Sequence, residues 1–234
     1  MRYDYKSALI VGAGAGLSAS LARLLHREAG MRIGLAARSV GKLDALVAET
    51  GAVAIACDAT QPADVDALFE TMERRLGGPP DVVVYNASGR SRGPFVDLDS
   101  ETVAQALAVS AFGGFLVAQR AARRMCAQGR GAILFTGASA SVKGYAQSAA
   151  FAMGKFALRG LAQSLARELS PQGVHIAHFV IDGAIRNPGR TEPPDAPDSM
   201  LNPDAIARAY LDVLRQDRSA WTWEIELRPW VERF

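Results

Sequence analysis

Apolar and polar positions follow a repeating order along this chain. Short runs that are apolar throughout are typical of strands buried on both faces of a sheet. Each run is followed by a longer stretch in which apolar residues recur on one side of a helix. The apolar runs predict strands at residues 9–11, 31–37, 52–57, 81–85, 132–136, 174–181 and 221–227. The periodic stretches predict helices at residues 20–29, 40–49, 63–75, 100–127, 149–168 and 204–215.

The alternation of strands with helices indicates the fold class. Parallel neighbours need a crossover connection, so strands that alternate with helices form a parallel sheet covered on both faces. We therefore predict an α/β, doubly wound Rossmann fold, with a seven-stranded, mainly parallel sheet between two helical layers. No linker or internal repeat divides the chain, so residues 1–234 are expected to form one domain. Ligands of such folds lie beyond the carboxyl ends of the strands.

A glycine-rich turn follows the first strand. Because glycine has no Cβ, backbone N–H groups come close to a bound anion, which the dipole of the next helix also favours. Gly14-x-Gly16-x-x-Ala19 fits the Rossmann pattern, whereas Gly12-x-x-x-Gly16-x-Ser18 fits a second one, with Ser18 where a third glycine is usual. Both patterns indicate a dinucleotide pyrophosphate site. Its predicted residues are Gly12, Gly14, Ala15 and Gly16.

The residues after the second strand indicate which dinucleotide is bound. A carboxylate there binds the ribose 2′-hydroxyl of NAD, but this chain has Ala37 followed by Arg38. The planar fork of an arginine suits a phosphate, and Ser39 adds a hydroxyl donor. We therefore predict NADP(H). The alternative is that Arg38 merely begins a surface helix.

The loops after the third and fourth strands supply further candidate cofactor residues. Asp58, with Ala59 beside it, follows the third strand and is expected to accept a hydrogen bond from the adenine amino group. Asp58 also suits a turn or a helix N-cap, and both roles can hold. After the fourth strand, the small residues of Asn86-Ala87-Ser88 leave room for the cofactor ribose.

Taken together, these motifs resemble the short-chain dehydrogenase/reductase family. The resemblance covers essentially the whole chain and rests on the glycine turn, Asp58, the 85–89 motif, Lys155 and the 181–185 segment. It implies a nicotinamide cofactor, hydride transfer on a small-molecule substrate, and a homodimer or homotetramer. It also implies that Leu17 and Asn86 line the cofactor, that Lys155 bonds its ribose, and that Ile185, near Gly183, contacts the carboxamide.

The chain departs from the family where the family places its proton donor. The family's Tyr-x-x-x-Lys reads here as Phe151-x-x-x-Lys155, a spacing that puts both side chains on one helical face. In the family the lysine lowers the pKa of the phenol and the tyrosine acts as general acid or base, but Phe151 has no proton to give. The family's serine position falls on Ala138, with Ser139 one residue later, and Ser110 stands at the family's asparagine.

These departures leave three possible outcomes. Another group could supply the proton, and the candidates are Ser139, Tyr145, Asp182 or a water held by Lys155. The substrate could instead need less help, or the chain could bind NADP(H) without turnover. We predict an NADP(H)-dependent oxidoreductase acting on a small carbonyl, imine or activated alkene. The alternative is a catalytically impaired NADP(H)-binding sensor or interaction module.

The composition indicates which classes of binding partner are not expected. The 26 basic and 24 acidic residues are interspersed, so no nucleic-acid face is expected. No apolar run is expected to reach the roughly 20 residues that span a bilayer. Cys57 and Cys126 have neither disulfide nor metal-ligand spacing, and the histidines form no ligand set, which indicates a cytoplasmic protein without a metal site.

Two C-terminal segments complete the prediction. The segment at 186–203 has five prolines and occupies the position of the family's substrate lid, where we expect a stiff, poorly helical loop. The last strand, 221–227, alternates large apolar with polar residues. We expect it at the edge of the sheet, where it covers the core or meets a partner subunit.

Overall fold

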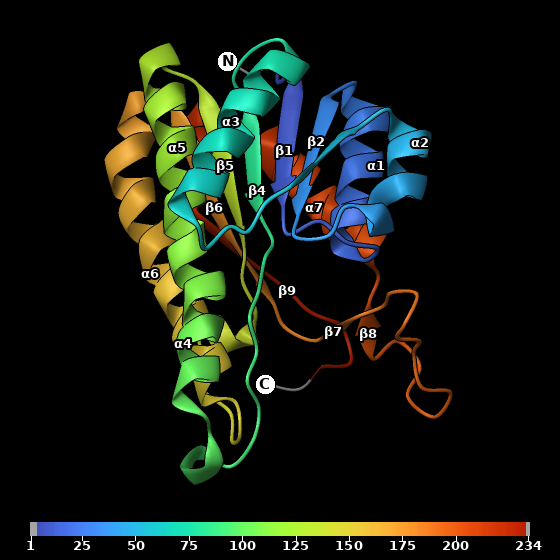
Figure 1. Ribbon diagram of the computed structural model, residues 1–234. Coiled ribbons are helices and arrows are strands. Elements are labelled where there is room, and N and C mark those ends of the chain that lie inside the picture. Colours follow the sequence, from blue (N-terminus) through green and yellow to red (C-terminus); the bar gives the residue numbers. More distant parts are fainter. Residues whose placement is uncertain (1–3, 233–234) are drawn as a thin grey trace.

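The computed structural model of the protein describes residues 4–232 and contains the predicted parallel sheet. Seven strands lie in the order β3-β2-β1-β4-β5-β6-β9, and every neighbouring pair is parallel (Figure 1). The strand order reverses between β1 and β4, which creates the crevice where doubly wound folds bind ligands. The strands are β1 (Ser7–Val11), β2 (Arg32–Ala37), β3 (Val53–Ala56), β4 (Val82–Tyr85), β5 (Gly131–Thr136), β6 (Val174–Ile181) and β9 (Glu224–Leu227).

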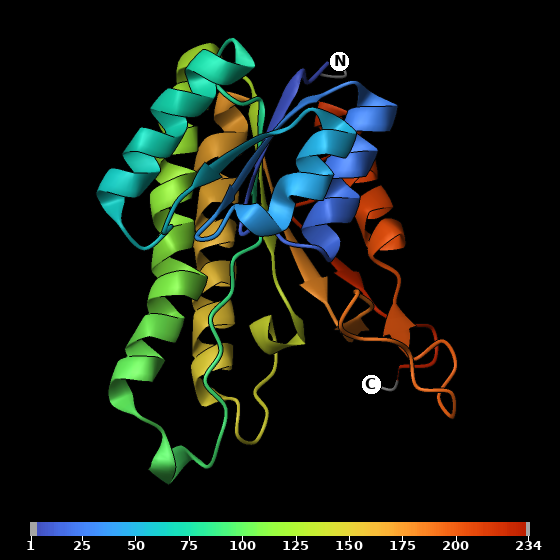
Figure 2. The same ribbon diagram turned by 45° about the vertical axis from the view of Figure 1, so that its right-hand side comes forward.

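Helices cover both faces of the sheet. Successive strand residues point to opposite faces, so Ile10 belongs to the core beneath α1, α2 and α7, while Leu9 belongs to the core beneath α3, α5 and α6. Figure 2 shows the two helical layers on either side of the sheet. The helices are α1 (Leu17–Ala29), α2 (Asp44–Thr50), α3 (Pro62–Leu76), α4 (Ser100–Leu107), α5 (Gly113–Gln128), α6 (Ala149–Leu169) and α7 (Pro203–Leu214).

The helix predicted at 100–127 is not regular. Residues Ala108–Phe112 form a π-helical segment between α4 and α5. Within it, the Val109 carbonyl accepts a short hydrogen bond from the hydroxyl of Tyr85 on β4. A Cβ at Gly113 would lie 2.4 Å from the same hydroxyl and 3.0 Å from the carbonyl oxygen of Ala59. The glycine therefore lets this helix approach another backbone closely.

The same helical stretch corrects the expectation about membrane-length segments. Ser100–Gln128 is long and apolar enough, by length and composition alone, to cross a membrane. In the structure it packs on the sheet, with Leu116 and Met125 in the core beneath β4 and β5. A core helix of an α/β domain meets the same criteria, so we interpret it as one.

The C-terminal segments take simple forms. The proline-rich loop contains no helix between 186 and 199, and short pairing of β7 (Ala184–Ile185) with β8 (Met200–Leu201) closes its base. β9 is an edge strand, as expected, and Ile225 packs on the core. It begins at Glu224 rather than at residue 221, and before it Trp221 stacks on His175 with 4.4 Å between the ring centroids.

Candidate active site

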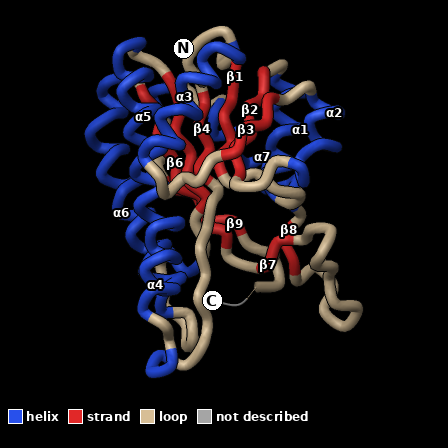
Figure 3. Tube along the Cα trace, in the orientation of Figure 1, coloured by secondary structure: helices blue, strands red, loops and turns tan. Residues whose placement is uncertain are grey.

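Two cavities lie side by side along the carboxyl edge of the sheet. The outer cavity, of about 340 Å³, opens between the loops after β1, β2, β3 and β4. The inner cavity, of about 250 Å³, lies among the start of α1, the loops after β4, β5 and β6, and the middle of α6. Asn86 and Ser88 line both cavities. Figure 3 shows these loops gathered at one edge, which provides an elongated site that crosses the switch point.

The glycine turn has the geometry that its sequence predicted. Gly12 has a φ of +85°, and a Cβ there would lie 2.4 Å from the backbone nitrogen of Ala87. Gly16 is the N-cap of α1, without a side-chain capping bond and without an acidic residue in the first helical turn. Nothing would lie within 4 Å of a Cβ at Gly14. A Cβ at Gly16 would lie 3.5 Å from the Cβ of Asn187, so the open space at the start of α1 is over Gly14.

A polar clamp fixes the turn and explains Ser18. The Ser18 hydroxyl donates to the carbonyl oxygen of Gly12 at 3.1 Å. The Asn86 amide donates to Ser18 Oγ at 2.8 Å and to the Gly12 oxygen at 3.3 Å. Ser18 therefore does what a third glycine could not do, because it ties the turn to the loop after β4. The pattern of Gly12, Gly16 and Ser18 describes this turn better than the Rossmann pattern.

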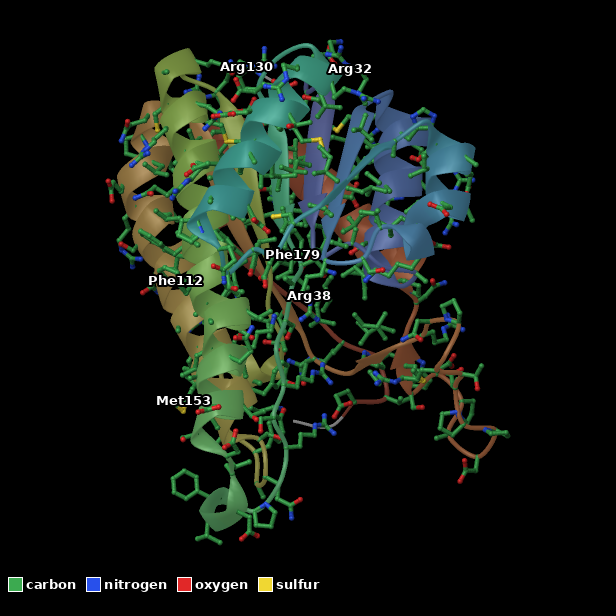
Figure 4. The ribbon with its side chains drawn as sticks, in the orientation of Figure 1. Arg32, Arg38, Phe112, Arg130, Met153 and Phe179 are labelled. Atoms are coloured by element: carbon green, nitrogen blue, oxygen red, sulfur yellow. The ribbon has the colours of Figure 1, made fainter. Side chains whose placement is uncertain are left out.

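The outer cavity has two cations at its far end. Arg38 and Lys42 both line it, and no ion pair joins either side chain to another of the described residues 4–232. Figure 4 shows Arg38 just beyond the carboxyl ends of the strands. Sequence reasoning missed Lys42, although its place four residues after Arg38 was a signal. Ser39 is not among the lining residues.

Asp58 takes the turn role and also lines the outer cavity. Its Oδ1 accepts from the backbone nitrogen of Thr60 at 3.0 Å and from the Thr60 hydroxyl at 2.8 Å. Its own backbone nitrogen donates to Asp64. The carboxylate is therefore fixed at the cavity wall. Ala59 and Ala87 contribute small side chains to the same wall.

Lys155 is the buried cation of the inner cavity. Its side chain is 3% exposed, and its ammonium donates to the carbonyl oxygen of Thr136 at 2.7 Å. Burial, with a smaller contribution from the nearby Arg90, lowers the pKa of Lys155 to about 7. Phe151 lies on the same face of α6, with its ring centroid 6.0 Å from the lysine nitrogen.

The structure separates the predicted proton donors. Ser139 and Tyr145 do not line the inner cavity, and neither does Asp182, whose carboxylate pairs with Lys143 at 3.5 Å. Ala138 lines it instead of Ser139. Lys155, which was predicted to hold a proton-donating water, does line the inner cavity.

Ser110, at the position of the family's asparagine, lies between the loop after β4 and α6. Its hydroxyl is fully buried, accepts from the backbone nitrogen of Gly89 at 2.9 Å, and donates to the Gly89 oxygen at 3.3 Å. Ser110 therefore holds the loop after β4, and this loop carries Asn86 and Ser88. It also packs against α6 next to Lys155, since a Cβ at Gly154 would lie 3.2 Å from Ser110 Oγ.

The remaining predicted residues divide between the cavities, and two arginines join them. Leu17, Gly183 and Ile185 line the inner cavity, whereas Ala15 lines neither. Arg90 and Arg190 also line the inner cavity, which sequence reasoning missed. Arg90 lies four residues after Asn86, but nothing in the sequence showed where its side chain would lie.

The arrangement fits an extended dinucleotide. The uncapped start of α1 and the open space over Gly14 suit a pyrophosphate. Arg38 and Lys42 suit a phosphate at the adenosine end, and Lys155 suits hydroxyl groups at the other end. The two cavities meet at Asn86, so one ligand can occupy both.

Comparison with known proteins gives a consistent result. Residues 6–191 match the family model described as short chain dehydrogenase. The 3-oxoacyl-[acyl-carrier-protein] reductase MabA of Mycobacterium avium is 33% identical over 181 residues, which cover 77% of this chain and 67% of that protein.

Solved structures agree. A short-chain dehydrogenase from Rhodopseudomonas palustris has a TM-score of 0.82 and 32% identity, covering 96% of this chain and 99% of its own. An alcohol dehydrogenase from the archaeon Thermococcus sibiricus, complexed with 5-hydroxy-NADP, has a TM-score of 0.85 and 25% identity, with coverage of 97% and 98%.

Proposed function

This chain belongs to the short-chain dehydrogenase family of oxidoreductases, and from that premise we propose that it is an NADP(H)-dependent enzyme. Its substrate would be a small carbonyl, imine or activated alkene. The observation that carries the proposal is the pair of cavities joined at Asn86, with a glycine turn in one and Lys155 in the other. This arrangement has the cofactor-binding residues expected of an oxidoreductase, with Phe151 at the position of the proton-donating tyrosine.

Each part of the proposed cofactor site has its own support. Gly12, Gly14 and Gly16 would hold the pyrophosphate with the start of α1, and Arg38 and Lys42 would bind the 2′-phosphate. Two unpaired cations at that end favour NADP(H) over NAD(H), because a 2′-hydroxyl gives them no charge to bind.

Several further residues complete the proposed binding site. Asn86 and the backbone around Ser88 would lie along the middle of the cofactor, where the two cavities meet. Leu17, Gly183 and Ile185 would enclose its nicotinamide end, and Asp58 its adenine.

The reaction needs a hydride and a proton. When bound, the reduced cofactor supplies the hydride, two electrons and one proton, to the electrophilic carbon of the substrate. The substrate oxygen, or the corresponding imine or alkene atom, then takes one proton from the protein side. In this chain Lys155 is the group at the cavity wall that can supply it, directly or through a water, because a pKa of about 7 allows it to lose a proton near neutral pH.

We extend the proposal to the oligomeric state and the cellular location of the protein. A homodimer or homotetramer is supported by apolar side chains exposed on α5 and α6, including Phe115 and Phe156. A cytoplasmic location is supported by Cys57 and Cys126, which are both free thiols.

Restoring the phenol tests this proposal. We expect the purified protein to oxidise NADPH with at least one member of a panel of small aldehydes, ketones, cyclic imines and enones. Phe151→Tyr should raise kcat on ketones by roughly 100- to 10,000-fold, because a positioned proton donor contributes about that much. The matched control is Phe95→Tyr, the same change on an exposed loop, which should leave kcat unchanged.

The pH profile tests Lys155 separately. In the direction of reduction, kcat/KM of the wild type should fall as the pH rises through the pKa of Lys155, about 7, because the deprotonated amine gives no proton. Lys155→Met should lose turnover. Saturable NADPH binding without oxidation across the panel, in both the wild type and Phe151→Tyr, would instead show a binding module.

A further inference from the structure

The inner cavity contains an excess of positive charge. Arg90 enters from the loop after β4, Lys155 from α6, and Arg190 from the proline-rich loop. None of the lining residues, all within the described range 4–232, is an aspartate or a glutamate. Positive groups concentrated in a small cavity with apolar walls raise its potential and attract anions.

Arg90 is held in a way that leaves its donors free. Its guanidinium carbon lies 4.5 Å from the ring centroid of Phe151. The attraction of a cation over an aromatic ring uses no hydrogen bond, so the N–H groups of Arg90 are left to bind a ligand. Burial, followed by the charges of Arg92 and Arg190, lowers the pKa of Arg90, so the charges that act on it are positive.

A tight turn holds the backbone of Arg190, whose exposed side chain lines the inner cavity. Its backbone nitrogen donates to the oxygen of Asn187 at 2.9 Å, and the Asn187 nitrogen donates back at 3.1 Å. The Asn187 side chain accepts from the nitrogen of Gly189 at 2.9 Å. The pairing of β7 with β8 anchors the base of the loop. The loop therefore presents Arg190 toward the cavity from the side opposite α6.

The carboxylates around the inner cavity bind other partners or lie in a neighbouring cleft, where Glu101 lines the wall together with Arg90. Asp182 pairs with Lys143, and Glu192 accepts from the backbone nitrogen of Met200 at 3.0 Å. Asp99, which with Arg90 lines a neighbouring cleft, accepts two hydrogen bonds from Thr102 as the N-cap of α4. Among residues 4–232, no ion pair neutralises Arg90 or Arg190.

We propose that the substrate carries an oxyanion, a carboxylate or a phosphate, close to its reacting group, and that Arg90 binds this oxyanion together with Arg190. Phe151 then orients Arg90, and this would be the function of a phenylalanine at the position of the family's tyrosine. The inference rests on the proposed function and names the substrate class of that same site. A competing use of the two arginines is to bind the cofactor's pyrophosphate.

A binding experiment separates these uses. The protein is saturated with NADP⁺ and titrated by calorimetry with malonate or inorganic phosphate, and with the neutral analogues dimethyl malonate and trimethyl phosphate. We expect at least one anion to bind at least about 10-fold more tightly than its neutral analogue, because a charge-assisted bidentate contact contributes that much. The anion that binds more tightly, malonate or phosphate, indicates whether the substrate carries a carboxylate or a phosphate.

The variants assign the effect to residues. Arg90→Ala should weaken anion binding by about 10- to 100-fold, and Arg90→Lys, which keeps the charge and loses the planar fork, by less. Arg190→Ala should also weaken it. The matched control is Arg92→Ala, which removes the same charge from the same loop outside the cavity and should change anion binding no more than about two-fold. If Arg90→Ala weakens NADP⁺ and leaves the anions unaffected, the arginine serves the cofactor and the inference is wrong.

A turnover experiment keeps the two proposals distinguishable. Short 2-oxo acids, and hydroxyketone phosphates, are compared with their methyl esters and unphosphorylated forms as substrates for NADPH oxidation. A kcat/KM that favours the charged partner, with a preference that collapses in Arg90→Ala, supports the inference. Anion binding without any turnover would refute the proposed function and leave the anion site standing. Equal use of charged and neutral partners, with no preference in binding, would refute the anion site.

Discussion

At the scale of single residues, the main feature of the site is its set of cationic side chains that form no ion pair with another of the described residues. Lys155 forms no ion pair with another of residues 4–232, and its burial, together with the charge of Arg90, lowers its pKa to about 7. Arg38 and Lys42 also have no ion pair within the described residues, so each is available to an anionic ligand.

The cofactor preference can be tested at one of these residues. Arg38→Ala should weaken NADPH binding by roughly 10- to 100-fold and NADH binding by less than about three-fold, since only NADPH carries the 2′-phosphate. Fluorescence titration of both cofactors measures this. Arg32→Ala is the matched control, since Arg32 lies on the same strand at the opposite edge of the sheet (Figure 4). Equal weakening of NADPH and NADH would refute the assignment to the phosphate.

At the scale of elements, two irregular segments shape the site. The glycine turn brings the backbone of Gly12 against Ala87, which joins β1 to the loop after β4. The π-helical segment Ala108–Phe112 places Val109 at the outer cavity and Ser110 against Gly89. Irregular backbone of this kind is frequent at functional sites.

Adding one carbon to the turn should therefore affect binding and stability together. Gly12→Ala requires a left-handed backbone and a Cβ only 2.4 Å from the Ala87 nitrogen, so we expect a loss of more than about 1 kcal/mol in the free energy of unfolding. NADPH affinity should fall at least about 10-fold. Urea unfolding and fluorescence titration measure the two effects.

A second glycine provides the control for that change. Gly160 lies on α6 and nothing would lie within 4 Å of a Cβ there, so Gly160→Ala should keep NADPH affinity and raise stability by up to about 1 kcal/mol. If Gly12→Ala behaved like Gly160→Ala, the close approach at the turn would not matter for binding.

At the scale of the whole molecule, one face is unusually apolar. Phe112 and Phe115 on one helical stretch, and Met153 and Phe156 on α6, are each between 41% and 51% exposed. Figure 4 shows Phe112 and Met153 on the outer side of this helical layer. Large apolar side chains gathered on one face are typical of a surface that meets another subunit.

We expect this face to form the contact between subunits. The wild type should sediment as a dimer or tetramer in analytical ultracentrifugation, and the double variant Phe115→Glu, Phe156→Glu should shift toward monomer because assembly would then bury two charges. Val96→Glu changes an apolar residue that is 89% exposed elsewhere and should leave the assembly unchanged. A monomeric wild type at micromolar concentration would contradict the expectation.

Much of the fold was predictable from the sequence by itself. All seven strands and their parallel pairing follow from apolar runs that alternate with helical periodicity, because both signals are local in the chain. The glycine turn was predictable for the same reason. The long helix at 100–127 was only partly right, since it contains a π-helical segment that contacts the Tyr85 hydroxyl from another strand.

The tertiary structure alone decided which polar side chains share a cavity. The sequence indicated that Lys155 and Phe151 lie on one helical face, but not that Arg90 would stack on Phe151 from a loop some sixty residues earlier in the chain. It offered Ser139 and Asp182 as proton donors, and packing placed both outside the cavity. Periodicity determines which residues face the core, whereas the meeting of loops depends on how whole elements pack, and no short stretch of sequence encodes that packing.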